Sequence, residues 1–81
     1  MKMTLIHGEF SANDALNLIT EMIHVKIRFH ENKITQAINE EDLKYRENKI
    51  KRLQKELFDL REYTQLKSGT IKLEASIQID A

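Results

Sequence analysis

The sequence predicts a mainly α protein in which two long antiparallel helices form a coiled-coil-like hairpin, flanked by short N- and C-terminal β-strands. Three observations carry this prediction. Proline is absent and the only glycines are Gly8 and Gly69, so the residues that weaken helices most lie outside the middle of the chain. Two runs within that middle repeat apolar residues at helical spacing. The last run, residues 70–80, alternates apolar and polar side chains as a half-buried strand does.

The first strand is expected at residues 3–10, Met-Thr-Leu-Ile-His-Gly-Glu-Phe. Its alternation is imperfect, and Gly8 predicts a bulge or an exit bend. Ser11 has the side chain of a helix N-cap, and Asp14 follows three residues later, close to a capping box. A helix is therefore expected over residues 12–38.

This first helix carries two apolar stripes on a wheel of about 100° per residue. The main stripe runs along its whole length and comprises Leu16, Ile19, Ile23, Ile27, His30, Ile34, Ala37 and Ile38. The second stripe lies nearly opposite, in the N-terminal half, and comprises Leu18, Met22, Val25 and Phe29. A helix that packs against one partner needs only one apolar stripe. The second stripe therefore predicts a further contact.

The second helix is expected over residues 40–67, after a very short connection. Asn39 suits its N-cap, and Glu40, Glu41 and Asp42 place negative charge in the first turn, where the helix dipole favours it. Its main stripe follows the 3–4 repeat of a coiled-coil seam and comprises Leu43, Arg46, Ile50, Leu53, Leu57, Leu60 and Thr64. The short connection requires the two helices to be antiparallel.

The last strand is expected over residues 70–80, with one aliphatic and one polar face. The aliphatic face comprises Ile71, Leu73, Ala75, Ile77 and Ile79. Each helix is about 40 Å long at 1.5 Å per residue, so the hairpin returns to the place where it began. The two terminal strands should therefore meet at its open end and run antiparallel. A two-stranded ribbon alone is marginally stable and has open edges.

Composition bounds the size, the location and the partners of the protein. Its 81 residues make one small domain, 1–81, whose single core is marginal. There is no cysteine, so oligomerisation is the remaining source of buried area. Thirteen basic and thirteen acidic residues cancel, which argues against a general polyanion binder. The sequence has no signal-peptide core and no membrane-spanning stretch, so a cytoplasmic location without a membrane partner is expected.

The second stripe and the open strand edges predict a homodimer or a higher homo-oligomer. The expected interface residues are Leu18, Met22, Val25, Phe29, Ile71, Leu73, Ile77 and Ile79. The same surfaces would allow an unknown protein partner to bind by strand addition or by helix packing. The leading functional prediction is therefore a small, non-enzymatic interaction or scaffold protein.

The alternative prediction is an accessory protein that binds nucleic acid through the basic segment 44–55. This segment contains six basic residues and a single acidic one, and its candidate contacts are Lys44, Lys51, Arg52 and Lys55. Several features argue against this alternative. The basic residues are spread around the helix, and the segment offers neither an aromatic stacking platform nor a glycine-containing helix-turn-helix corner.

No catalytic, cofactor-binding or metal-binding residue is assigned. Glu21 and His24 have the Glu-x-x-His spacing of four-helix di-metal proteins, but the motif occurs once and Arg28 nearby would repel a metal ion. The chain has no cysteine nucleophile and no glycine-rich phosphate loop. A protein without enzymatic activity and without a cofactor is therefore expected.

Two polar residues interrupt the apolar stripes of the helices. Pairing the stripes places His30 opposite Ile50 and Arg46 near Ile34, where Arg46 should extend toward solvent and pair with Asp42. Polar groups at such positions can fix the register or the oligomeric state. A pH-sensing role for His30 is the alternative to a simple hydrogen bond at the seam.

Overall fold

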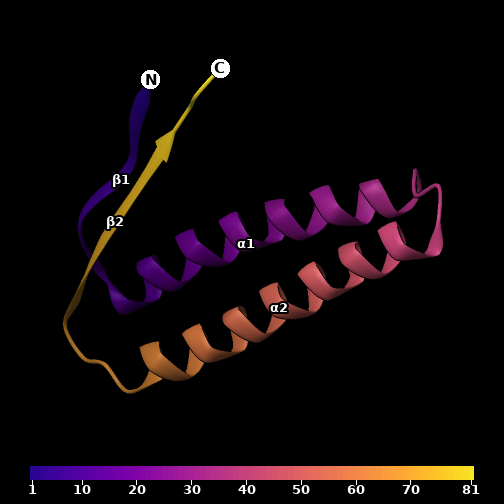
Figure 1. Ribbon diagram of the computed structural model, residues 1–81. Helices are drawn as coiled ribbons and strands as arrows, with labels where there is room; N and C mark the ends of the chain where they lie inside the picture. Colours follow the sequence, from indigo (N-terminus) through magenta and orange to yellow (C-terminus); the bar gives the residue numbers. More distant parts are fainter.

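The computed structural model describes all residues 1–81 and contains four elements. They are strand β1 (Lys2–Ser11), helix α1 (Ala12–Ile34), helix α2 (Glu40–Gln65) and strand β2 (Thr70–Gln78). The helices pack as a hairpin, and the strands pair antiparallel as a two-stranded ribbon at its open end (Figure 1). The predicted fold class is therefore confirmed.

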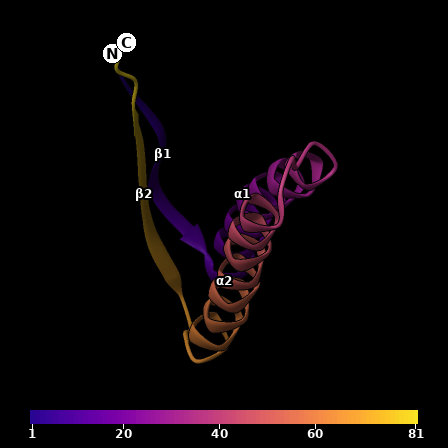
Figure 2. The ribbon, with the colours of Figure 1, turned by 45° about the vertical axis from the view of Figure 1, so that its right-hand side comes forward.

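The ribbon and the helical hairpin diverge from the end that they share, as the legs of a V (Figure 2). Helix α1 contacts both α2 and the ribbon, whereas the ribbon does not approach α2 closely. The Cα atoms span 47 × 32 × 13 Å, and their radius of gyration is 15.3 Å. A compact domain of this length would have a radius of gyration of about 12 Å. The molecule is therefore flat and open, unlike a domain built from two fully packed layers.

Both predicted N-caps are present. The Ser11 hydroxyl accepts a hydrogen bond of 3.1 Å from the backbone N–H of Asp14. The Asn39 side-chain oxygen accepts one of 2.8 Å from the backbone N–H of Asp42. Each bond satisfies a helix N–H group that has no partner within the helix, and such a cap typically stabilises a protein by about 1 kcal/mol.

Both helices end earlier than the sequence predicts. Helix α1 stops at Ile34 and not at residue 38, and α2 stops at Gln65 and not at residue 67. The chain needs a few residues to reverse its direction between antiparallel helices, and residues 35–39 serve this purpose. Ile38 is 94% exposed in this connection, so it does not belong to the main stripe as predicted.

The ribbon has one apolar face and one polar face. Residues that pair directly across the two strands share a face. The pairs on the apolar face are Phe10 with Ile71, Gly8 with Leu73, Ile6 with Ala75, and Met3 with Ile77. The pairs on the polar face include His7 with Glu74 and Glu9 with Lys72. We refer to the first set of pairs as the ribbon's apolar face.

The predicted bulge at Gly8 is wrong, because the irregularity lies at Leu5. Gly8 pairs regularly with Leu73, although its φ of +150° favours glycine at this position. The register shifts between Thr4 and Ile6, which leaves Leu5 as the extra residue. A shift by one residue exchanges the two faces of a strand, so the bulge places Met3 on the ribbon's apolar face.

The buried core is small and lies along the seam between the helices. Its centre is formed by Ile23, Leu53 and Leu57, and the partly buried residues packed against it are Ile19, Ile27 and Leu60. These residues belong to the two predicted main stripes. Only 6 of the 81 residues are buried, so the seam provides nearly all of the hydrophobic core.

Candidate functional site: an apolar cleft

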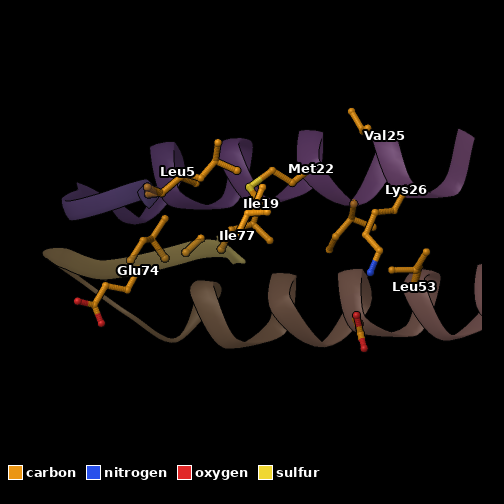
Figure 3. A pocket seen from close by; sticks show the side chains of 13 residues that line it. Leu5, Ile19, Met22, Val25, Lys26, Leu53, Glu74 and Ile77 are labelled. Carbon is orange, nitrogen blue, oxygen red and sulfur yellow. The ribbon is translucent and has the colours of Figure 1, made fainter. Parts of the chain in front are cut away.

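The angle between the ribbon and the helical hairpin contains an open cleft of about 710 Å³ (Figure 3). Ten of its 13 lining residues are hydrophobic. The ribbon contributes Leu5, Ile6, Leu73, Ala75 and Ile77 to this lining. Helix α1 contributes Ile19, Met22, Ile23 and Val25, and α2 contributes Leu53. The cleft is therefore an apolar surface shared by three of the four elements and by β1.

The side chains of α1 divide between the inside and the outside of this cleft. Ile19 and Met22 lie between α1 and the ribbon, whereas Val25 points away from α2 (Figure 3). Lys26 extends its amine toward α2, and the Glu74 carboxylate points away from the apolar side chains (Figure 3). The charged groups of the lining therefore lie apart from one another and do not converge on one point.

The apolar side chains become more exposed with distance from the shared end of the V. On the ribbon, Ile71 and Leu73 are half-buried, whereas Ile77 is 42% exposed and Ile79 is 47% exposed. On α1, Met22 is half-buried, whereas Val25 is 56% exposed and Phe29 is 52% exposed. Because the two legs of the V diverge, the chain covers only the inner part of its own apolar surfaces.

The predicted interface residues do not form a single patch. Four of them line the cleft, namely Met22, Val25, Leu73 and Ile77. Leu18 lies beside Phe10 in a separate shallow hollow of about 370 Å³. Phe29 lies nearer the loop, where the Arg46 guanidinium is 5.7 Å from the centre of its ring. Ile71 pairs with Phe10 at the inner end of the ribbon, and the backbone N–H of Ile79 donates to the carbonyl of Met1 at the outer end.

The contribution of β1 to this surface is absent from the sequence prediction. Met3 is 41% exposed and Leu5 is 49% exposed, and both add to the apolar surface that Ile77 provides. The bulge at Leu5 interrupts the period of two, so alternation alone cannot assign these residues to a face. Aligning β1 against β2 with a shift of one residue would have revealed them, because each apolar residue then meets an apolar partner.

His30 and Arg46 form a hydrogen bond across the helical seam. Arg46 Nη1 donates to His30 Nδ1 at 3.0 Å. The predicted ion pair between Arg46 and Asp42 is wrong, because the pairs present are His7 with Glu74 and Lys55 with Asp59. A guanidinium can only donate, so His30 Nδ1 must be the acceptor and its proton must be on Nε2. The seam thus holds His30 as a neutral ring.

The surroundings of His30 oppose its protonation. Burial lowers the pKa of His30 from its ordinary value of 6.5, and the positive charges of Arg46, Lys26 and Lys49 lower this pKa further. The ring is 9% exposed, and it meets the Phe29 ring edge to face with a centroid distance of 5.4 Å. Neither an ion pair nor a hydrogen bond with a carboxylate offsets these positive charges.

The candidate nucleic-acid contacts are exposed but do not form one patch. Lys44, Lys51 and Lys55 are spaced by seven and four residues, so they lie along one side of α2. Arg52 follows Lys51 directly and therefore points to a different side. The Lys55 amine is paired with the Asp59 carboxylate at 3.2 Å.

No three side chains of the kinds that bind metal ions gather anywhere in the structure. Glu21 is exposed and His24 is half-buried, without a second such motif beside them. None of the helices combines the length and the apolar character that crossing a membrane requires.

A functional assignment by similarity is not possible for this chain. Comparisons with protein-family models, with curated proteins and with solved structures find no match. The functional argument therefore depends on the geometry described above.

Proposed function

We propose that this protein is a small, non-enzymatic interaction protein that works as a homo-oligomeric scaffold. Its partner surface consists of the cleft, the ribbon's apolar face and the open edge of β2. The single observation that carries the proposal is an excess of exposed surface. The chain exposes 6500 Å², whereas a compact folded monomer of 9.6 kDa exposes about 5,100 Å². Apolar side chains of the ribbon and of α1 provide a large part of the exposed area near the cleft.

The character of the cleft supports binding of a protein surface and not catalysis. An active site usually combines a concave pocket with a few convergent polar groups. Here the charged lining groups are Lys26, Glu56 and Glu74, and they form no ion pair with one another. Contiguous exposed apolar surface with a polar rim is typical of protein–protein interaction sites.

Replacing both Val25 and Phe29 with aspartate should dissociate the assembly while leaving the hairpin helical. Both side chains are more than half exposed in the single chain, so the change removes little internal packing. In an apolar interface, the two new carboxylates would be desolvated without partners, which is strongly unfavourable. The measurement is sedimentation equilibrium over a range of concentrations, with circular dichroism to verify the helix content.

The matched control is Phe58→Asp, which places the same charge at a side chain of similar exposure outside the cleft. Phe58 is 58% exposed and does not line the cleft. The control should sediment as the unchanged protein does. A wild-type mass of 9.6 kDa at all concentrations up to about 100 times micromolar would contradict the proposal. So would an assembly that survives Val25→Asp with Phe29→Asp but not Phe58→Asp.

A second candidate function is nucleic-acid binding through α2. The observation that favours it is that Lys44, Lys51 and Arg52 are exposed and form no ion pair with an acidic residue. Replacing Lys44, Lys51 and Arg52 with alanine should then abolish binding to a short nucleic acid and reduce its salt dependence. The measurement is a fluorescence-anisotropy titration at several salt concentrations. An absence of binding by the wild-type chain at low salt would exclude this function.

A further inference from the structure

We infer that the cleft is covered by a second copy of this chain, arranged about a two-fold axis so that each copy's ribbon lies on the other copy's α1. Two surfaces define this arrangement. The outer ribbon face comprises Met1, Met3, Leu5, Ile77 and Ile79, and the outer stripe of α1 comprises Leu18, Met22, Val25 and Phe29. The inference rests on the proposed function and specifies both the partner and the surfaces that meet.

The exposed area fits a dimer. Each chain exposes about 1,400 Å² more than a compact monomer of its mass would. A standard protein–protein interface buries about 800 Å² on each partner. One reciprocal contact of this size would therefore leave each chain with the exposure of an ordinary folded protein and needs no additional partner.

The two surfaces also match in length. From Leu18 to Phe29 the helix rises about 16 Å at 1.5 Å per residue. From Met1 to Leu5 the strand extends about 13 Å at 3.3 Å per residue, and its partner strand covers the same length. The outer ribbon face can therefore lie along most of the outer stripe. In a two-fold pair this contact is made twice, because each chain provides one copy of each surface.

The chain does not cover this stripe by itself. Its own ribbon diverges from α1 toward the outer end of the V, and Val25 remains 56% exposed (Figures 1 and 2). The ribbon is apolar on one face only, and its other face carries Lys72 and Glu74, which need water. The ribbon can therefore cover one apolar surface but cannot be inserted between two.

Charge is compatible with a second copy as the occupant. The chain carries no net charge at neutral pH, so two copies do not repel each other over long distances. None of the residues of the outer ribbon face or the outer stripe has a charged side chain. The contact therefore requires no burial of unpaired side-chain charge.

Cross-linking between two different variants tests this arrangement, because the natural sequence contains no cysteine. One chain carries Ile77→Cys and the other, made with a larger tag, carries Phe29→Cys. The two chains are unfolded, mixed in equal amounts, refolded and oxidised by air. We expect the mixed disulfide to exceed both of the products that join like chains, since the ribbon of one copy meets the stripe of the other. Replacing the first variant with Ser76→Cys, on the polar face, should abolish the mixed product.

The outcomes distinguish this inference from the proposed function. If the wild-type chain sediments as an oligomer but Ile77→Cys links mainly to itself, the ribbons meet each other and the inference is wrong, while the proposed function stands. If the wild-type chain is monomeric at every concentration, both are wrong. If a single chain carrying Ile77→Cys and Val25→Cys closes an internal disulfide as a monomer, its own ribbon covers α1 and the inference is overturned.

Discussion

Replacing Leu57 with alanine should lower the free energy of unfolding by about 2–5 kcal/mol. Leu57 is 7% exposed and packs with Ile23 and Leu53 at the centre of the helical seam. Removing its branched end deletes buried apolar surface and leaves a cavity, because the neighbouring side chains relax only partly. A chain of this length has a total stability of roughly 4–12 kcal/mol, so the loss would be a large fraction of it.

The effect is large because so few residues share the load. The buried hydrophobic residues are Ala15, Ile23, Leu53 and Leu57. The ribbon contacts α1 only, so it cannot hold α2 in place when the seam is weakened. Loss of seam packing should therefore unfold the helical hairpin as a unit.

The measurement is urea unfolding followed by circular dichroism, at one fixed protein concentration because assembly would contribute to stability. The matched control is Leu66→Ala, which deletes the same atoms at a side chain that is 85% exposed. The control should change stability by no more than about 0.5 kcal/mol. Equal losses for the two variants would show that the seam is not the core of the folded protein.

Acidification should destabilise the hairpin through His30 before the carboxylates begin to be protonated. The folded protein lowers the pKa of His30, whereas the unfolded chain has the ordinary value of about 6.5. Below that pH the unfolded state binds more protons than the folded state, so the free energy of unfolding decreases as the pH falls. The decrease ends once the pH has passed the lowered pKa of the folded protein.

The structural cause of this loss is a change in the role of His30 Nδ1. In the neutral ring this nitrogen accepts the hydrogen bond of 3.0 Å from Arg46. In the protonated ring both nitrogens are donors, so a donor would face a donor. The new charge would also lie near Arg46, Lys26 and Lys49, without a carboxylate in an ion pair to offset it.

Urea unfolding at several pH values between about 7.5 and about 5.5 measures the effect, with His30→Gln as the comparison. The glutamine side-chain oxygen can accept from Arg46 but does not titrate, so this variant should lose much less stability over the same range. The positions of His7 and His24 are unchanged in both proteins and cancel in the comparison. The same dependence on pH in both proteins would show that His30 does not carry it.

The sequence by itself determined the elements and their order. Unbroken 3–4 spacing between Gly8 and Gly69 specifies two helices, because these glycines are the only ones and there is no proline. The caps at Ser11 and Asn39 were predictable because N-cap hydrogen bonds are local and span three residues. Alternation over residues 70–80 predicted the last strand for the same reason.

Only the tertiary structure decided how the elements lie in space and which polar groups meet. Arg46 bonds to His30 on the other helix and not to the nearby Asp42, because packing of the seam brings the two side chains together. The bulge at Leu5 depends on how β1 pairs with a strand about 70 residues away, so it is not a property of β1 alone.

The candidate site lies on the same boundary between local and tertiary information. Helical periodicity revealed that Val25 and Phe29 form a surplus stripe, because that pattern is local. The angle between the ribbon and α1 is set by contacts between elements, and it leaves these side chains more than half exposed. The sequence therefore specified an apolar surface that needs a cover, and the diverging legs of the V decided that the chain itself does not provide it.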